Sequence, residues 1–132
     1  MLVEIGSTFG GLVFARMGGI KCGIYADENL LHTCYGMSLA ILGAGLTAFG
    51  LNKSYDQGRM HGYLMSAAAL GFIVHLRLSD EHLMNVNKIN QIYPGKGETI
   101  VGIGEMAEGF ALFVGVSVAL IANRCFAPAD RH

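Results

Sequence analysis

The sequence predicts an all-α integral membrane protein, folded as a compact bundle of four transmembrane helices in a single domain, residues 1–132. Three observations support this prediction. Apolar residues make up 52% of the chain and charged residues only 14%, against about 25% charged in an ordinary soluble domain. The apolar residues gather in long uncharged runs. Small residues recur within each run at every fourth position, which is typical of helices that pack closely in lipid.

The strongest membrane-spanning segment is 29–51, which contains no Asp, Glu, Lys or Arg. A helix needs about 20 such residues to cross a hydrocarbon core of about 30 Å. A shorter segment at 60–78 begins directly after Arg59 and is uncharged up to Arg77. Arginines at the ends of a span can extend toward the headgroups, so we expect this segment to span as well.

Two further segments carry charges. Residues 99–123 are apolar apart from two glutamates and predict a third span. Residues 5–25 contain Arg16 and Lys21, and a charge at mid-membrane costs about 2.5–3.5 kcal/mol on insertion scales. This segment therefore either spans with Arg16 facing protein or lies tilted at the interface, which would leave three spans.

The connections differ in length. A polar turn is expected at 26–28 and a short hairpin at 52–59, whereas 78–98 is a long polar loop that contains the helix breaker Pro94-Gly95-Lys96-Gly97. The polar loop is the one region with room for an extramembrane feature. Lys and Arg divide almost evenly between the two sides, so the positive-inside rule does not predict an orientation.

Each apolar segment carries a stripe of small residues at four-residue spacing, which places the members of a stripe near one another on a helix face. In lipid, such stripes allow helix backbones to approach closely. We expect the stripes to pack the four helices together, or to pack them on neighbouring subunits. The predicted packing residues are Gly11, Ala15, Gly19 and Gly23; Gly36, Ala40, Ala44 and Ala48; Ala67 and Gly71; and Ala107, Ala111, Gly115 and Ala119.

Four charged residues form the predicted intramembrane or interfacial charge site: Arg16, Arg77, Glu105 and Glu108. The two glutamates lie three residues apart and therefore share one helix face. Ionisable groups within a span usually face protein or water. We expect the positive end of the helix, together with pairing to Arg16 or Arg77, to stabilise both carboxylates.

An alternative role for Glu108 is proton carriage. The run Glu108-Gly109-Phe110-Ala111-Leu112-Phe113 resembles the proton-binding helix of rotary ATPase ring subunits. The Gly-rich preceding helix and the Arg-Gln-Pro loop of those subunits are missing, and the chain is longer than they are. We therefore prefer the structural role for this carboxylate.

The run Ser66-Ala67-Ala68-Ala69-Leu70-Gly71 ends its segment at Arg77, and a polar hairpin with Lys53, Asp56 and Arg59 precedes it. With the small-residue stripe of the first segment, this pattern resembles the preprotein and amino-acid transporter superfamily. That superfamily comprises four-span proteins of mitochondrial inner-membrane translocases, plastid amino-acid channels and an accessory subunit of respiratory complex I.

The resemblance implies a non-catalytic accessory subunit of a mitochondrial respiratory-chain complex, complex I first, as a multi-pass protein of the inner membrane. The implied partners are other membrane subunits and phospholipids, including cardiolipin. Two alternatives stay open: a translocase or small-solute transporter of the same fold, and a subunit associated with ATP synthase.

Other classes of function find little support in the sequence. The net charge of −1 leaves no basic surface for nucleic acid. His61 and His75 lie 14 residues apart, about 21 Å along a helix, and cannot share a metal; a haem role for His75 is the open alternative. No nucleophile stands beside a plausible base. We expect no enzyme, no cofactor and no metal.

Overall fold

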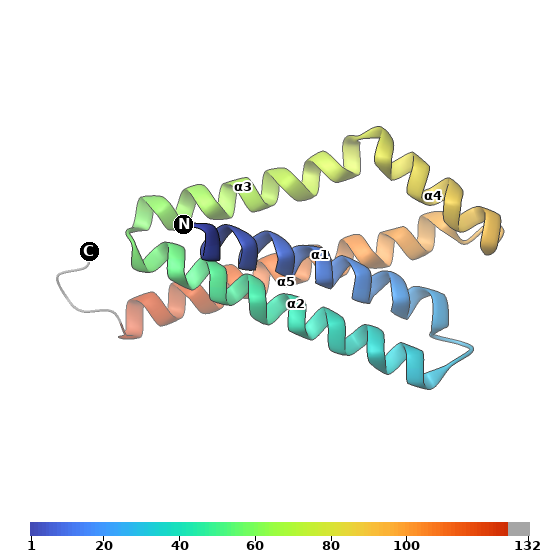
Figure 1. Cartoon of the computed structure of the whole chain (residues 1–132), viewed down its shortest axis with the longest axis horizontal. Coiled ribbons are helices and arrows are strands. Elements are labelled where there is room, and N and C mark those ends of the chain that lie inside the picture. The colour runs from blue at the N-terminus through green and yellow to red at the C-terminus, as the bar shows by residue number, and fades with distance from the viewer. Residues whose placement is uncertain (127–132) are drawn as a thin grey trace.

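The computed structural model of the chain describes residues 1–126, which form five helices and no strand (Figure 1). The all-α prediction is therefore confirmed for the described part of the chain. The helices are α1 Leu2–Tyr25, α2 Leu30–Asp56, α3 Arg59–Leu78, α4 Asp80–Ile92 and α5 Gly97–Phe126.

Helices α1, α2 and α5 pack against one another and form the centre of the bundle, whereas α3 runs along its outside (Figure 1). Leu12 and Leu51 are fully buried in this centre, together with the small side chains of Ala15 and Ala119. Helix α4 bends away from α3 by 57° and returns to pack on the start of α5. The two ends of the bundle are thus the α2–α3 turn and the α4 region.

Two helices are long and apolar enough to cross a membrane, α2 over Leu30–Asp56 and α5 over Gly97–Arg124. A third appears only if α3 and the bent α4 count as one span. The predicted four-span bundle is therefore shown only in part. The predicted spans 29–51 and 99–123 lie within or close to these helices, whereas 5–25 and 60–78 form helices that do not pass the same test alone.

The turn between α2 and α3 is shorter than expected, because α2 continues to Asp56 and leaves only Gln57 and Gly58 between the helices. Gly58 has φ +145°, a conformation that glycine adopts without steric cost and other residues rarely do. The tight turn sets α3 antiparallel to α2.

The polar loop expected at 78–98 contains helix α4, which is a correction to the sequence prediction. Ser79 precedes the helix and Asp80 and Glu81 lie in its first turn, where the positive helix end favours carboxylates. His82 and Val86 lie four residues apart, so they share the buried face of α4. The polar composition hid a helix that exposes most of its surface.

Helices α1 and α2 touch backbone to backbone. A β-carbon built on Gly18 would lie 2.5 Å from the nitrogen of Ala40, and one built on Gly36 would lie 3.0 Å from the nitrogen of Cys22. Thr47 Oγ1 donates to the carbonyl oxygen of Thr8 at 3.3 Å across the same interface. The contacting positions alternate between four-residue and three-residue steps: Thr8, Gly11, Ala15, Gly18 and Cys22 on α1, and Gly36, Ala40, Gly43, Thr47 and Gly50 on α2.

This register corrects the predicted four-residue stripes. A strict four-residue step turns by about 40° relative to a helix of 3.6 residues per turn, so a stripe of five members drifts by about 160° around the helix. Alternating three and four holds one face toward one partner. In α1 the stripe therefore divides: Gly11 and Ala15 face α2, whereas a β-carbon on Gly19 would lie 2.8 Å from the Ala107 Cβ of α5.

The members of the α2 and α5 stripes likewise contact different partner helices. Gly36 and Ala40 face α1, whereas Ala44 packs against the core cluster and Ala48 N would lie 3.3 Å from a β-carbon on Gly115. The α5 stripe packs along its whole length. Ala111 and Ala119 are buried, and Ala107 and Gly23 line the α1–α5 contact, where Gly23 meets Ile103.

The α3 stripe does not pack against any other described helix, so of the two expected kinds of packing, within the bundle or on a neighbouring subunit, only the second stays open for it. Ala67 and Gly71 are exposed, and a β-carbon on Gly71 would meet no atom within 4 Å. The packing face of α3 instead carries Ala69, which is fully buried, and Phe72, whose ring meets Phe9 of α1 edge-on at 5.4 Å.

Candidate functional site

The first feature of the candidate site is an ion pair between the central helices. Arg16 of α1 donates from Nη1 to Glu108 Oε1 of α5 at 3.3 Å, and the two side chains are 11% and 0% exposed. Arg16 lies where α1 packs closely on α5, since a β-carbon built on Gly104 of α5 would lie 3.0 Å from the Arg16 carbonyl oxygen. Arg16 therefore faces protein, as the spanning placement of this segment requires, while the structure by itself does not establish that α1 spans.

Glu108 is not fully satisfied by this pair. Its Oε2 is buried without a hydrogen-bond partner among the described residues. The hydrogen bond from Arg16 at 3.3 Å is therefore the one side-chain hydrogen bond that the described residues give to this buried carboxylate. Removing one partner of such a pair leaves an unpaired buried charge, which is far costlier than replacing both partners with apolar groups.

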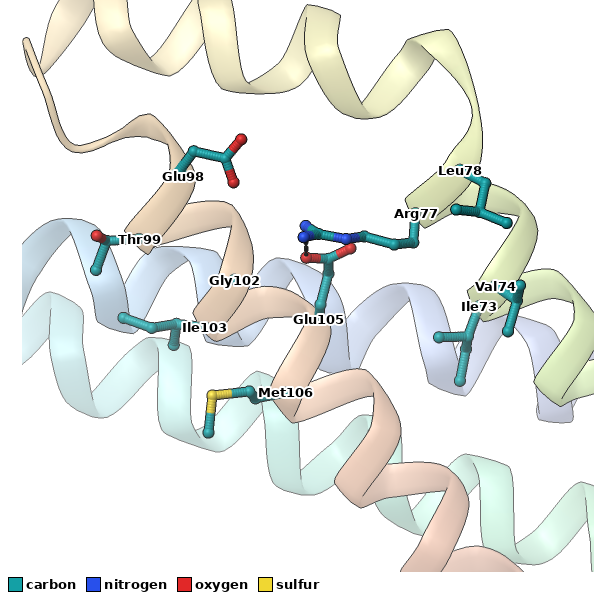
Figure 2. Close-up of a pocket in the computed structure, with 10 residues that line it drawn as sticks. All are labelled: Ile73, Val74, Arg77, Leu78, Glu98, Thr99, Gly102, Ile103, Glu105 and Met106. Atoms are coloured by element: carbon teal, nitrogen blue, oxygen red, sulfur yellow. Dashed lines mark hydrogen bonds and ion pairs between the residues drawn. The ribbon is translucent and has the colours of Figure 1, made fainter.

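The second feature is a charged cluster where α3, α4 and α5 meet, made of Arg77, His82, Glu98 and Glu105. Arg77 Nη1 donates to Glu105 Oε1 at 2.9 Å, an interaction drawn as a dashed line in Figure 2. The same nitrogen lies 3.0 Å from His82 Nε2. Arg77 and Glu105 are 52% and 16% exposed, so water screens this pair far more than the Arg16–Glu108 pair.

His82 and Glu98 are the residues of this cluster that the sequence prediction of the site missed, and their side chains lie 3.7 Å apart, from Nε2 to Oε2. His82 is the more deeply buried of the two. It is buried, and its Nδ1 lies 3.7 Å from Glu105 Oε2. Because a guanidinium can only donate, Nε2 must accept from Arg77, which places the ring proton on Nδ1, facing Glu105. The sequence feature that could have predicted the burial of His82 is its four-residue spacing from the apolar Val86, which places both residues on the inner face of α4.

A pocket of about 660 Å³ opens beside this cluster, between α3 and α5 (Figure 2). Its charged end holds Arg77, Glu98 and Glu105, and its walls are apolar, with Val74 from α3 and Met106 from α5. An apolar groove that ends at charged side chains suits an amphiphilic molecule, whose polar part would lie at the charged end of the groove. Within residues 1–126, no three His, Cys, Asp or Glu side chains lie close enough together to hold a metal ion.

Replacing Arg77 with glutamine should loosen α4, because the guanidinium joins α4 to α5 through His82 and Glu105. We expect amide hydrogen exchange in α4 to rise about fivefold, the equivalent of about 1 kcal/mol, with α1 and α2 unchanged. Lys88→Gln removes the same charge from the exposed side of α4 and serves as the control. Equal exchange in both variants would contradict a docking role for Arg77.

The described chain is thus an all-helical protein that has ion pairs between its helices and contains two helices able to cross a membrane. Comparison with models of protein families, with curated proteins and with solved structures finds no match.

Proposed function

We propose that the chain is a non-catalytic, multi-pass membrane subunit that packs within a larger membrane assembly. The support begins with α2 and α5, which are long and apolar enough to span. Large apolar side chains are exposed on every long helix, among them Phe14, Ile41, Leu64 and Phe110. Water would not tolerate so much exposed apolar surface, whereas lipid or neighbouring subunits would cover it.

The proposal includes four membrane-crossing segments. Of the two charges that make 5–25 a poor span, Arg16 and Lys21, Arg16 lies nearer the middle, and its pairing with Glu108 offsets part of the cost of placing either partner in lipid. Both partners point into the bundle, as charged residues of membrane helices usually do. In this arrangement the shorter α3 crosses with Arg59 and Arg77 at its two ends.

One observation supports the role as a subunit: the small-residue stripe of α3 has no packing partner among residues 1–126. Every other stripe is used for helix packing, whereas Ala67 and Gly71 are exposed beside Leu70 and Val74. Small residues flanked by large apolar ones form the surface on which a second helix packs closely in a membrane. We infer that a helix of another subunit covers this face.

The interior of the bundle supports a structural role over transport. A transporter needs polar groups along an accessible cavity, but α1 and α2 are closed by backbone contact at Gly18 and Gly43. From the resemblance to the preprotein and amino-acid transporter superfamily, we further propose that the assembly is a mitochondrial respiratory-chain complex of the inner membrane. Other membrane subunits and phospholipids such as cardiolipin would be the partners.

Gly71→Leu tests this proposal. The variant should keep its fold, because a β-carbon at Gly71 meets no described atom within 4 Å, yet the leucine side chain should block the neighbouring helix and deplete the protein from its assembly. The measurement is the share of the protein that co-migrates with a large complex after mild detergent extraction, compared with Gly71→Ala, which keeps the surface small. An unchanged share in Gly71→Leu, or migration of the native chain only as a small homo-oligomer, would count against the proposal.

A further inference from the structure

The ends of α2 and α5 and the start of α3 lie together at one end of the bundle, opposite α4 (Figure 1). A second pocket is lined by residues of these three helix ends. Its volume is about 250 Å³, and polar atoms make up much of its lining. It is separate from the charged cluster of α4 and shares no residue with the pocket there. The residues that line it are Tyr55, Arg59, Tyr63, Leu120, Asn123 and Arg124.

Two guanidinium groups from different helices line this pocket. Arg59 is the first residue of α3 and Arg124 lies in the last turn of α5, and both side chains are exposed. Arg59 already has an interaction within the chain, but a guanidinium carries five N–H donors, so one partner leaves others available. Two such forks at one pocket match the oxygen atoms of a phosphate group.

Buried groups hold the floor of the pocket in place. Asn123 Nδ2 donates to the carbonyl oxygen of Tyr55 at 3.2 Å, and Tyr55 itself is only 2% exposed. The Tyr55 hydroxyl lies 3.0 Å from Ser66 Oγ, and its ring meets Tyr63 edge-on at 5.8 Å. The pocket is therefore built on a fixed junction of α2, α3 and α5, not on surface side chains alone.

The charge balance at this end favours an anion. Among the residues that the structure describes, Lys53, Arg59 and Arg124 are the side-chain cations of the adjoining helix ends, and they outnumber the carboxylates of Asp56 and the buried Glu4. Helix α3 also begins without a side-chain cap and without an acidic residue in its first turn. Its positive end is therefore not neutralised by its own residues.

We propose that this pocket binds the phosphate of an anionic phospholipid headgroup. This inference rests on the membrane assignment of the proposed function, because both arginines sit where apolar stretches end and headgroups would lie. Basic pockets between membrane helices are a common form of headgroup site. The volume is smaller than a typical small-molecule site of 300–1,000 Å³, so the pocket takes the headgroup and leaves the acyl chains outside along the helices.

The test uses the purified full chain in detergent with equal amounts of phosphatidylglycerol and phosphatidylcholine, and native mass spectrometry counts the lipid retained. The wild-type chain should retain phosphatidylglycerol in preference to phosphatidylcholine. R59Q/R124Q should lower phosphatidylglycerol retention by about tenfold or more, because both sets of charge-assisted hydrogen bonds to the phosphate are lost. K88Q/K96Q, which removes two charges at the opposite end, should leave retention unchanged.

Equal losses in R59Q/R124Q and K88Q/K96Q would overturn the proposal, since they would show a general charge effect. Inorganic phosphate alone that competes as well as the lipid would overturn the lipid assignment in favour of a free anion. If R59Q/R124Q does not stay folded by circular dichroism, R59K/R124K replaces it. That variant keeps both positive charges but loses the paired N–H donors of the guanidinium groups. Reduced phosphatidylglycerol retention supports the site, and unchanged retention overturns it.

Failure of this inference is distinguishable from failure of the proposed function. A chain that assembles into a large membrane complex but retains no anionic lipid refutes only the headgroup site. A chain that migrates as a small homo-oligomer refutes the role as a subunit, whatever lipid it retains.

Discussion

Replacing Gly43 with leucine is expected to separate α1 from α2 and lower the free energy of unfolding by about 3 kcal/mol or more, the upper range for overpacking. A β-carbon at Gly43 would collide with the carbonyl oxygen of Gly11 and lie 2.5 Å from the nitrogen of Ala15. These are backbone atoms, which cannot rotate away. The helices must move apart, and every close contact along their interface weakens.

Gly45→Leu is the matched control for this prediction. Gly45 lies two residues further along the same helix and a β-carbon there meets nothing within 4 Å, so the same substitution should change stability by less than about 1 kcal/mol. The measurement is unfolding of the purified protein in mild detergent by titration with dodecyl sulfate. Equal midpoints for the two variants would show that the α1–α2 interface is not closed by backbone contact.

The second large effect is expected at the Arg16–Glu108 pair. Glu108→Leu should lower stability by about 3–5 kcal/mol, because it leaves the nearly buried Arg16 without its carboxylate. Arg16→Met combined with Glu108→Leu should recover most of that loss, since two apolar side chains of similar size need no compensation. The double-mutant cycle, measured in the same titration, isolates the coupling between the two residues.

The Arg77–Glu105 pair provides the comparison. Arg77 is half exposed, so Glu105→Gln should change global stability by only about 0–1 kcal/mol. A double variant at Arg16 and Glu108 that is no more stable than Glu108→Leu would contradict the pairing. It would also reopen a role for Glu108 that depends on its carboxyl group, including the proton carriage that its surrounding sequence suggests.

The two central predictions concern different forces. Gly43 tests steric contact between backbones, which is insensitive to ionic strength. Glu108 tests electrostatic compensation in a site from which water is excluded, and such pairs are weakly screened by salt compared with the exposed Arg77–Glu105 pair. Repeating both titrations at high salt should therefore leave the first effect unchanged and alter the Arg77–Glu105 contribution most.

Much of the helical architecture follows from the sequence alone. Long uncharged runs around 29–51 and 99–123 predict α2 and α5, and small residues in each run predict close packing. The choice of Arg16 and Arg77 as partners for Glu105 and Glu108 also follows from the sequence, because charges within apolar segments must be compensated nearby. These are local properties of composition and spacing, and they need no knowledge of which helices are neighbours.

The tertiary structure decided which charges pair and which helix faces are buried, because both depend on which helices are neighbours. It assigned Arg16 to Glu108 and Arg77 to Glu105, and it showed that Gly71 faces outward although it belongs to the same kind of stripe as Gly11. It also placed His82 in the cluster, on a helix that the polar composition of its segment had concealed. The physical reason is that a helix face becomes an interface only when a second helix meets it, and the contact repeat that results depends on the crossing of the two helices.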